Sequence, residues 1–244
     1  MKKSLAFILA AFLMLTGTSF AERLNVGTDT AFVPFEFKGQ DGEYTGFDID
    51  LWAEIATRIG KEYTLRPMDF NGLIPGLTTG NLDVALAAIF IKAEREKSID
   101  FSHPYFRAGL KVLVSSDNTD IQGPADLEGK VVAVKLGTAT VEYVESLNPE
   151  RIVKFPNIDQ AYLEVVTGGA DAAMHDTPNV LYYVAEAGQG RVKAVGPDVK
   201  AAQYGIAFPL GSPLRKDVNV ALLEMMEDGT YDELYVKWFG EEPE

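Results

Sequence analysis

Val84-Ala85-Leu86-Ala87-Ala88-Ile89 is a continuous apolar run that ends shortly before the fixed cation Arg95. A short apolar run of this kind is typical of a strand buried on both faces of a parallel sheet. Side chains just beyond the carboxyl ends of such strands face the crevice where open α/β sheets bind ligands. Because the planar guanidinium of Arg95 suits a carboxylate, the sequence predicts an anion-binding group at this sheet edge. The plain alternative is a surface arginine paired with Glu94 or Glu96.

Strand-like and helix-like runs alternate on both sides of this segment, which is the pattern of an α/β protein. In one predicted helix Phe47, Leu51, Ile55 and Ile59 recur at four-residue spacing, and Gly60 ends it. The first set has predicted strands at 24–28, 63–67 and 84–89 and helices at 47–60 and 73–79. The second set has predicted strands at 111–114, 131–134, 152–155, 172–175 and 192–194 and helices at 139–147, 158–167 and 177–187. A last strand at 203–208 precedes helices at 214–227 and 231–239, which we expect to dock back on the first set.

The N-terminal segment, residues 1–21, has the composition of a cleavable signal peptide. A basic start at Lys2 and Lys3 precedes an apolar core, and Ser19 and Ala21 frame Phe20 as a cleavage site. The chain contains no cysteine, so neither a disulfide nor a lipid-acceptor cysteine is expected. The sequence thus predicts a periplasmic protein that is not a lipoprotein.

Composition and missing motifs exclude several classes of function. A formal net charge of −14 argues against nucleic acid as a partner. With two histidines and no cysteine, we expect no metal site and no cofactor. Residues 123–130 resemble a phosphate-binding loop, but the spacing is one residue too long and Val131 replaces the required Ser or Thr. A Gly-x-Ser-x-Gly motif is absent, and a ligand-sensing ectodomain would need a membrane anchor that the sequence does not display.

An ordered set of motifs runs along the whole mature chain. The motifs are Thr28-Asp29-Thr30-Ala31-Phe32-Val33-Pro34-Phe35-Glu36-Phe37, Gly46-Phe47-Asp48-Ile49-Asp50-Leu51-Trp52, Pro67-Met68-Asp69-Phe70, Val131-Val132-Ala133-Val134-Lys135, Phe155-Pro156-Asn157-Ile158-Asp159, His175-Asp176-Thr177-Pro178-Asn179, Gln203-Tyr204-Gly205-Ile206-Ala207-Phe208 and Lys237-Trp238-Phe239-Gly240. In order and spacing this set resembles the periplasmic amino-acid-binding components of ABC importers, bacterial solute-binding protein family 3. Within that family the resemblance is greatest to the glutamine-binding branch.

The resemblance implies a two-lobed periplasmic-binding-protein fold of type II, the Venus-flytrap architecture, with two crossover hinge strands. The large lobe would comprise residues 22–104 and 205–244, the small lobe residues 110–199, and the hinges residues 105–109 and 200–204. Such a protein is expected to be a monomer that closes around its ligand and delivers it to an ABC importer permease in the inner membrane. The implied role is transport of a polar amino acid, L-glutamine first, rather than catalysis.

The resemblance also assigns roles to residues in the cleft. Arg95 would bind the ligand α-carboxylate and Asp176 its ammonium group, while Asp29 and Lys135 together would face a neutral amide side chain. The expected ligand-binding positions are Asp29, Phe32, Phe70, Ala88, Phe90, Arg95, Lys135, Thr138, Ala139, His175 and Asp176. For the residues taken one by one, plain alternatives exist: Asp29 and Asp176 could cap the next turn or helix, and Phe32 and Phe70 could be core.

Three positions depart from the pattern of the glutamine-binding branch. Ala88-Ile89-Phe90 stands where relatives have Gly-x-Thr, and Ala139 stands where they have glycine. The lost hydroxyl and the added bulk leave open a different small carboxylate or amino acid as the ligand. A further alternative is a periplasmic dehydratase similar to cyclohexadienyl dehydratase, in which Asp29, Lys135, His175 and Asp176 would supply acid and base groups.

Overall fold

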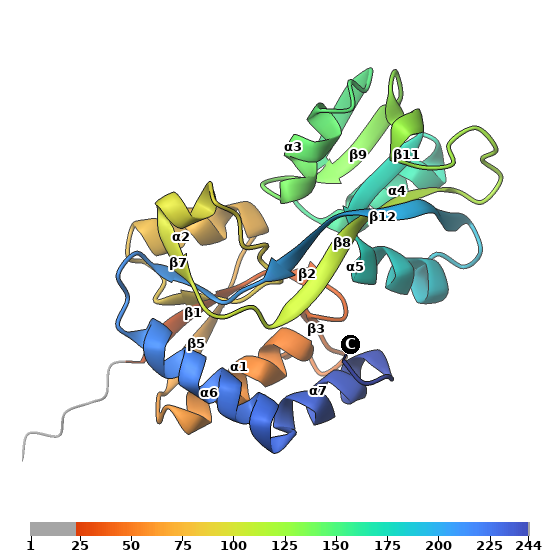
Figure 1. The fold of residues 1–244 in the computed structure, drawn as a ribbon. Helices are drawn as coiled ribbons and strands as arrows, with labels where there is room; N and C mark the ends of the chain where they lie inside the picture. The colour runs from red at the N-terminus through yellow and green to blue at the C-terminus, as the bar shows by residue number, and fades with distance from the viewer. Residues whose placement is uncertain (1–22, 244) are drawn as a thin grey trace, which may run out of the picture.

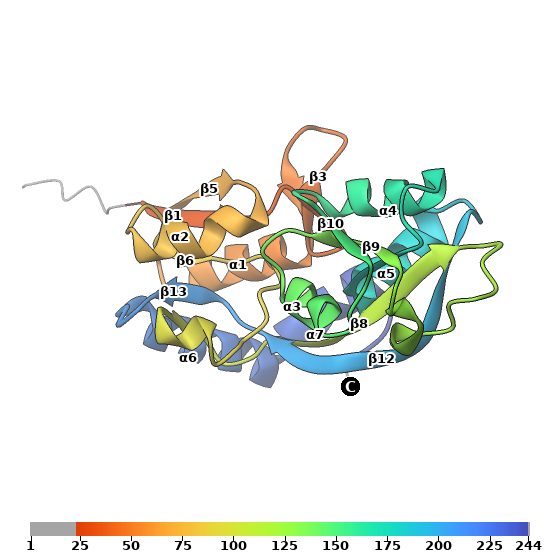
Figure 2. The same ribbon diagram turned by 90° about the horizontal axis from the view of Figure 1, so that it is seen from above.

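The computed structural model describes residues 23–243, which form two α/β halves lying side by side (Figures 1 and 2). The predicted signal peptide, residues 1–21, lies outside the described residues. Across the described range no helix is both long and apolar enough to cross a bilayer. Each half is built on a central sheet of five strands within the described residues, so the predicted α/β class is confirmed.

The first sheet has the strand order β5-β1-β6-β13-β7. Strands β5, β1 and β6 run parallel, whereas β13 is antiparallel to both β6 and β7. Apolar side chains of α1 are buried on one face of the sheet and those of α2 on the other. The elements are β1 (Leu24–Thr28), α1 (Phe47–Arg58), β5 (Tyr63–Pro67), η1 (Phe70–Gly72), α2 (Leu73–Thr78), β6 (Val84–Ala85), η2 (Arg95–Lys97), β7 (Ile99–Phe101), β13 (Ala207–Pro209), α6 (Leu214–Asp228) and α7 (Thr230–Phe239).

The second sheet has the strand order β10-β9-β11-β8-β12. Strands β10, β9 and β11 run parallel, and β8 is antiparallel to both β11 and β12. The elements are β8 (Phe106–Ser115), η3 (Pro124–Leu127), β9 (Val131–Lys135), α3 (Ala139–Glu145), β10 (Arg151–Phe155), α4 (Ile158–Thr167), β11 (Ala172–Asp176), α5 (Thr177–Tyr182), the π-helical turn η4 (Tyr183–Ala187) and β12 (Val192–Tyr204). Helices α3, α4 and α5 pack against this sheet.

Two long strands join the halves. β8 leaves the first half and β12 returns to it, and the pair runs antiparallel between the two halves (Figure 1). The predicted strand over 203–208 is in fact two strands, since β12 ends at Tyr204 and β13 begins at Ala207 in the other sheet. Between them the backbone N–H of Gly205 donates to the carbonyl of Ile89. The chain therefore returns to its first half, while the exact domain and hinge limits stay predictions.

The predicted strand over 84–89 is shorter than expected. β6 covers only Val84–Ala85, and beyond it Ala88 has φ 46°, a left-handed conformation outside the β region. The amide of Ala88 instead donates to Asp48 Oδ2 of α1 at 2.8 Å. A contact from another element thus fixes the chain beyond the strand and turns residues 88–90 toward the space between the halves.

A three-stranded sheet that the sequence analysis missed precedes α1. Its strands are β2 (Ala31–Phe32), β3 (Glu36–Lys38) and β4 (Tyr44–Thr45), in the order β2-β3-β4. Gly46 then turns the chain into α1 with φ 133°, and a Cβ at this position would lie 2.1 Å from the carbonyl oxygen of Phe35. Only glycine permits this approach, which lets the amide of Asp48 donate to that same carbonyl at 2.9 Å.

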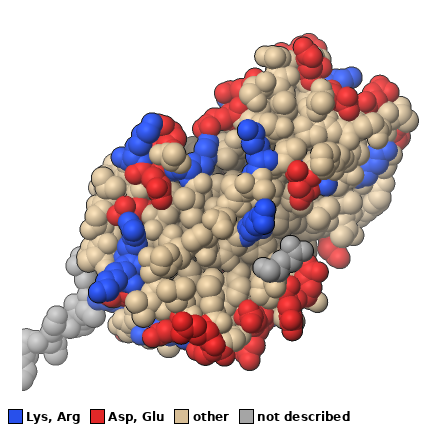
Figure 3. All heavy atoms as spheres, viewed as in Figure 1, with Lys and Arg blue, Asp and Glu red and all other residues tan. Residues whose placement is uncertain are grey.

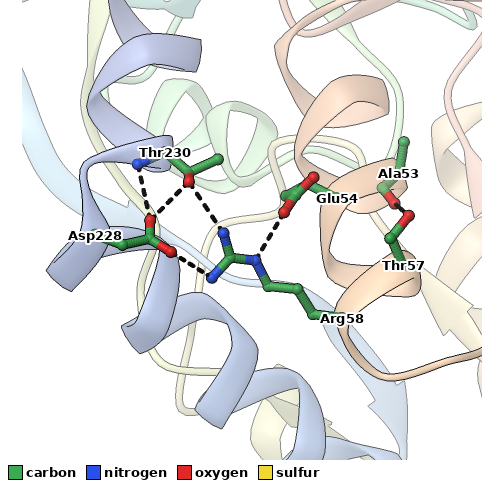
Figure 4. A network of polar contacts seen from close by, with 6 residues as sticks. All are labelled: Ala53, Glu54, Thr57, Arg58, Asp228 and Thr230. Carbon is green, nitrogen blue, oxygen red and sulfur yellow. Dashed lines mark hydrogen bonds and ion pairs between the residues drawn. The ribbon is translucent and has the colours of Figure 1, made fainter.

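The last two helices dock on the first half, as predicted. At their corner, Arg58 of α1 donates to Asp228 Oδ2 at 2.8 Å, to Thr230 Oγ1 at 3.0 Å and to Glu54 Oε1 at 2.8 Å (Figure 4). Hydrogen bonds from Thr230 and Arg58 lower the pKa of Asp228 to about 2. This network fixes the turn between α6 and α7 against α1.

Candidate functional site

A narrow cavity lies between the two halves, and its free space of about 10 Å³ holds about one water molecule. The side chains that line it must therefore move apart to admit a molecule of amino-acid size. Every binding residue predicted from the sequence lines it, together with Ala87, which the sequence analysis missed. The lining residues are Asp29, Phe32, Phe70, Ala87, Ala88, Phe90, Arg95, Lys135, Thr138, Ala139, His175 and Asp176.

The charged groups reach the cavity from the carboxyl ends of parallel strands. Asp29 follows β1, Lys135 is the last residue of β9, and Asp176 is the last residue of β11. Arg95 opens η2, a short helical turn beyond β6. The carboxyl ends of both sheets face the same space, which brings these side chains together.

Asp29 and Lys135 form a direct ion pair across the two halves, and each side chain is 2% exposed. Burial raises the pKa of Asp29 even though Lys135 acts in the opposite direction. The Lys135 ammonium also lies 5.5 Å from the ring centroid of Phe32 and 5.8 Å from that of Phe70. From the sequence, the two charges are expected to face a ligand side chain. In the structure they contact each other, so an amide would have to insert between them.

Arg95 is held by backbone oxygens on both sides of the cavity. It donates to the carbonyl of Phe90 at 2.9 Å and to that of Gly137, in the other half, at 3.3 Å. Its guanidinium carbon lies 5.6 Å from the ring centroid of Phe70. Burial lowers the pKa of Arg95, and the nearby Asp176 opposes this change. A guanidinium has five N–H donors, so groups remain for a carboxylate.

Asp176 is a buried carboxyl anchored by the crossover strand β12. It accepts a hydrogen bond from Tyr204 at 2.6 Å, and burial raises its pKa to about 7. Although Asp176 occupies the N-cap position of α5, its side chain makes no capping hydrogen bond, so the plain capping alternative is not realised. Its remaining lone pairs are available to an ammonium group.

His175 lies beside these groups as a neutral ring. Burial and the positive charge of Lys135 lower its pKa well below the ordinary value. Its Nδ1 is 3.3 Å from Asp176 Oδ1, a contact that is no ion pair because the ring is uncharged. Within the described part of the chain neither ring nitrogen has a hydrogen-bond partner. The ring packs edge-on against Phe32, with centroids 5.1 Å apart.

The remaining predicted residues shape the wall. Thr138 donates to the carbonyl of Lys135 at 2.8 Å, which fixes the turn into α3, and Ala139 begins that helix. The Phe90 ring lies 4.8 Å from that of Tyr204. Phe90 and Ala139 also line a neighbouring groove, so they separate it from the cavity.

Further contacts hold the two halves together around the cavity. Asn179 of α5 donates to the carbonyl of Val33 at 2.7 Å, and Lys92 pairs with Glu142 of α3 at 2.5 Å. Gly137, with φ 79°, lies so close to Asn71 that a Cβ on the glycine would be 2.9 Å from the Asn71 Cβ. The structure is therefore a closed arrangement. Sequence patterns gave no signal for these contacts, because each joins segments from different halves.

The cavity has a balanced set of charges. Among the described residues that line it, Asp29 and Asp176 are acidic and Arg95 and Lys135 are basic. Within residues 23–243 no group of three or more His, Cys, Asp or Glu side chains is placed to hold a metal ion. On the face shown in Figure 3, basic side chains gather near the junction of the two halves, whereas acidic side chains are spread over both.

Known proteins are similar to this chain in both sequence and fold. Residues 24–241 match the family described as bacterial extracellular solute-binding proteins, family 3. "ABC transporter arginine-binding protein 1" of Escherichia coli (strain K12) is 31% identical over 243 residues, covering 98% of each chain.

Two solved structures extend the comparison. "An ancestral arginine-binding protein bound to glutamine" is 42% identical with a TM-score of 0.86, over 90% of this chain and 98% of the other. "The ancestral amino acid-binding protein AncCDT-1, a precursor of cyclohexadienyl dehydratase" is 41% identical with a TM-score of 0.82, over 89% and 95%. These similarities confirm the predicted two-lobed periplasmic-binding-protein fold of type II.

Proposed function

Because the chain belongs to the bacterial extracellular solute-binding proteins of family 3, we propose that it binds a polar amino acid between its lobes and delivers it to an ABC importer. The relative named an ABC transporter arginine-binding protein, which matches almost the full length of the chain, supports the importer as partner. Closure of the two lobes around the ligand is the signal that the permease would recognise, since the ligand contacts both.

The observation that carries this proposal is the charge balance of the interlobe cavity. Two carboxyl groups and two cations line it among the described residues, and they come from both lobes. A zwitterion with an uncharged side chain leaves this balance intact, whereas an extra charge of either sign meets a like charge at Asp29 or Lys135. The cavity therefore suits an amino acid that is neutral overall.

The ligand head group binds between Arg95 and Asp176. The α-carboxylate takes the N–H groups of Arg95 that do not contact Phe90 or Gly137, in a charge-assisted bond. The ammonium group donates to Asp176, whose other partner is Tyr204. Phe32 and Phe70 flank the aliphatic stem and exclude water.

L-Glutamine is the side chain that fits the far end best. Its amide donates from NH2 to Asp29 and accepts at oxygen from Lys135, so it satisfies both members of the pair that it separates. A related solved protein, an ancestral arginine-binding protein, is described as bound to glutamine, which supports an amide ligand on this scaffold. Ala88, Phe90 and Ala139 narrow the space around the head group, so a different small amino acid is the second candidate.

Binding, not turnover, is the proposed activity. The similarity to AncCDT-1 is a specific reason to test the dehydratase alternative, since that protein is described as an amino-acid-binding precursor of such an enzyme. A dehydratase needs a carboxyl group poised to protonate a leaving hydroxyl. Asp176, the cavity carboxyl with a pKa near 7, is already engaged with Tyr204 and is assigned here to the ammonium.

The protein is proposed to act as a monomer in the periplasm, exported by the signal peptide predicted at residues 1–21. The predicted lobe limits, with hinges at 105–109 and 200–204, belong to the same proposal. Both hinge ranges adjoin or lie within the crossing pair β8 and β12.

Calorimetric titration of refolded, ligand-stripped protein with single amino acids tests the proposal. We expect glutamine to bind tightest, and glutamate and arginine at least about tenfold weaker, because a like-charge contact costs more than the roughly 1.4 kcal/mol that a factor of ten represents. Absence of any heat with glutamine, alongside binding of another carboxylate, would overturn the ligand assignment. Turnover of prephenate or arogenate by the purified protein would favour the dehydratase instead.

A further inference from the structure

Two buried carboxyl groups, Glu36 and Asp48, lie behind the cavity wall. Glu36 belongs to β3 and Asp48 to the first turn of α1, and each residue is 0% exposed. The sequence analysis assigned neither of them a role. The two carboxyl groups interact directly, and hydrogen bonding with Glu36 lowers the pKa of Asp48, against the larger effect of burial.

Asp48 links the cavity wall to the start of a crossing strand. Its Oδ2 accepts from the amide of Ala88 at 2.8 Å and from the hydroxyl of Tyr105 at 2.8 Å. Ala88 lines the cavity with φ 46°, and Tyr105 immediately precedes β8. Tyr105 is tied further, because its amide donates to the carbonyl of Tyr204 at 3.0 Å.

Glu36 lacks the hydrogen-bond donors that Asp48 has. Among residues 23–243 neither of its carboxyl oxygens has a hydrogen-bond partner that can donate, and the Oδ1 of Asp48 is equally without one. A buried carboxylate with no donor is among the least favourable groups in a protein. If Glu36 is protonated, its hydroxyl can donate a hydrogen bond to Asp48 Oδ1, and the buried charge on Glu36 is removed.

We propose that Glu36 is a protonated positioning residue, whose hydroxyl donates to Asp48 and thereby fixes the carboxylate that holds Ala88 in the ligand cavity and Tyr105 at the crossing strand. This inference rests on the proposed function in one respect, since it takes the cavity at Ala88 as the ligand site. No other role for Glu36 is required.

The surroundings place the proton on Glu36 rather than on Asp48. Burial raises the pKa of Glu36 well above its ordinary value, and the nearby charges of Asp48, Asp29 and Asp176 act in the same direction against Lys135. Burial raises the pKa of Asp48 as well, to about 7, but Asp48 has two donors to its Oδ2 and lies in the first turn of α1, where the helix dipole favours negative charge. A carboxylic acid at Glu36 gives Asp48 Oδ1 a donor and leaves no buried charge on Glu36, whose carbonyl oxygen alone stays without a donor among the described residues.

Because Glu36 binds this proton in the folded protein, the free energy of unfolding depends on pH. The folded protein holds this proton more tightly than the unfolded chain, so the contribution of Glu36 to stability is fully present below the ordinary pKa of 4.5 and declines as the pH rises toward the raised pKa of Glu36. In Glu36→Gln the amide NH2 donates to Asp48 at every pH, so this decline disappears. In Glu36→Ala the donor is lost altogether.

The test compares wild type with Glu36→Gln, Glu36→Ala and the matched control Glu43→Gln, an exposed glutamate between β3 and β4. Infrared spectra at neutral pH should show a protonated-carboxyl band in wild type and Glu43→Gln that Glu36→Gln lacks. Between the ordinary and the raised pKa, the unfolding equilibrium should shift by up to about tenfold per pH unit in wild type relative to Glu36→Gln. Glutamine affinity should stay within about threefold in Glu36→Gln and fall about tenfold or more in Glu36→Ala.

Two results would overturn the proposal: no protonated-carboxyl difference between wild type and Glu36→Gln, or a Glu36→Gln variant as impaired in binding and stability as Glu36→Ala. If Glu36→Ala does not fold, the Glu36→Gln comparison still decides. The infrared and unfolding measurements need no ligand. A protein that binds no amino acid would therefore refute the proposed function while leaving these two measurements to judge Glu36.

Discussion

Gly137→Ala should block closure of the lobes without unfolding either of them. Gly137 has φ 79°, and an added Cβ would lie 2.9 Å from the Cβ and 3.1 Å from the Cα of Asn71, in the other lobe. Backbone and Cβ atoms cannot swing away, so the lobes must stay apart by a few tenths of an ångström or repack. Overpacking of this kind costs about 1–3 kcal/mol. Since the cost applies only to the closed form, affinity should fall about fivefold to 150-fold.

Gly168→Ala provides the matched control. Gly168 ends α4 with the same φ of 79°, and a Cβ there would have no neighbour within 4 Å. Both variants place alanine in the left-handed region, which costs about 1–2 kcal/mol of folding free energy. Urea unfolding should therefore show similar losses for both, whereas calorimetry with glutamine should show weaker binding only for Gly137→Ala.

Scattering from the two variants completes the test. With saturating ligand, Gly168→Ala should contract as wild type does, and Gly137→Ala should contract less. If Gly137→Ala lost the same stability as Gly168→Ala and yet bound and contracted like wild type, the close contact between the lobes would not be part of the ligand-bound state, and the reasoning would be refuted.

Three other predictions concern residues of the site. Ala88→Gly should leave the free energy of unfolding in urea unchanged, because φ 46° strains alanine and not glycine. Replacing alanine by glycine commonly costs about 0.5–1 kcal/mol, and a loss of that size here would contradict the prediction. The affinity for glutamine should decline as the pH falls below about 7, by up to about tenfold per pH unit, since protonation of Asp176 removes the acceptor for the ligand ammonium group. In Asp176→Asn the affinity should not change over this pH range. An unchanged decline in that variant would show that a different group titrates. Asp29→Asn or Lys135→Met alone should each weaken glutamine binding at least about tenfold, because one charge stays buried without its partner. A calorimetric double-mutant cycle should show partial recovery of affinity in the double variant. Additive losses would argue against a coupled pair.

Much of the fold follows from local pattern. The predicted strands at 24–28 and 63–67 and the helix at 158–167 have the same limits in the structure, because clear periodicity and turn residues bound them. The predicted strand limits are wrong where another element intervenes. Asp48 accepts a hydrogen bond from the amide of Ala88 beyond the end of β6, and the predicted strand at 203–208 crosses from one sheet to the other. Periodicity reports an element but not the sheet it joins.

The candidate site was predictable as a set of residues and not as a geometry. The carboxyl ends of strands and the resemblance together identified the residues that line the cavity. Direct pairing of Asp29 with Lys135 could not be foreseen, since it depends on how far the two lobes close. Tyr204 and the Glu36–Asp48 pair escaped notice for a similar reason, because their roles arise from contacts between distant segments.

The central claim is that Arg95 and its partners neutralise a small zwitterion that bridges both lobes. Calorimetric titration of Arg95→Ala with glutamine, beside the surface control Arg23→Ala, tests it most directly; Arg23 pairs with Glu62 and is 63% exposed. The account predicts loss of measurable binding in Arg95→Ala and wild-type affinity in Arg23→Ala. Undiminished binding by a folded Arg95→Ala protein would contradict it.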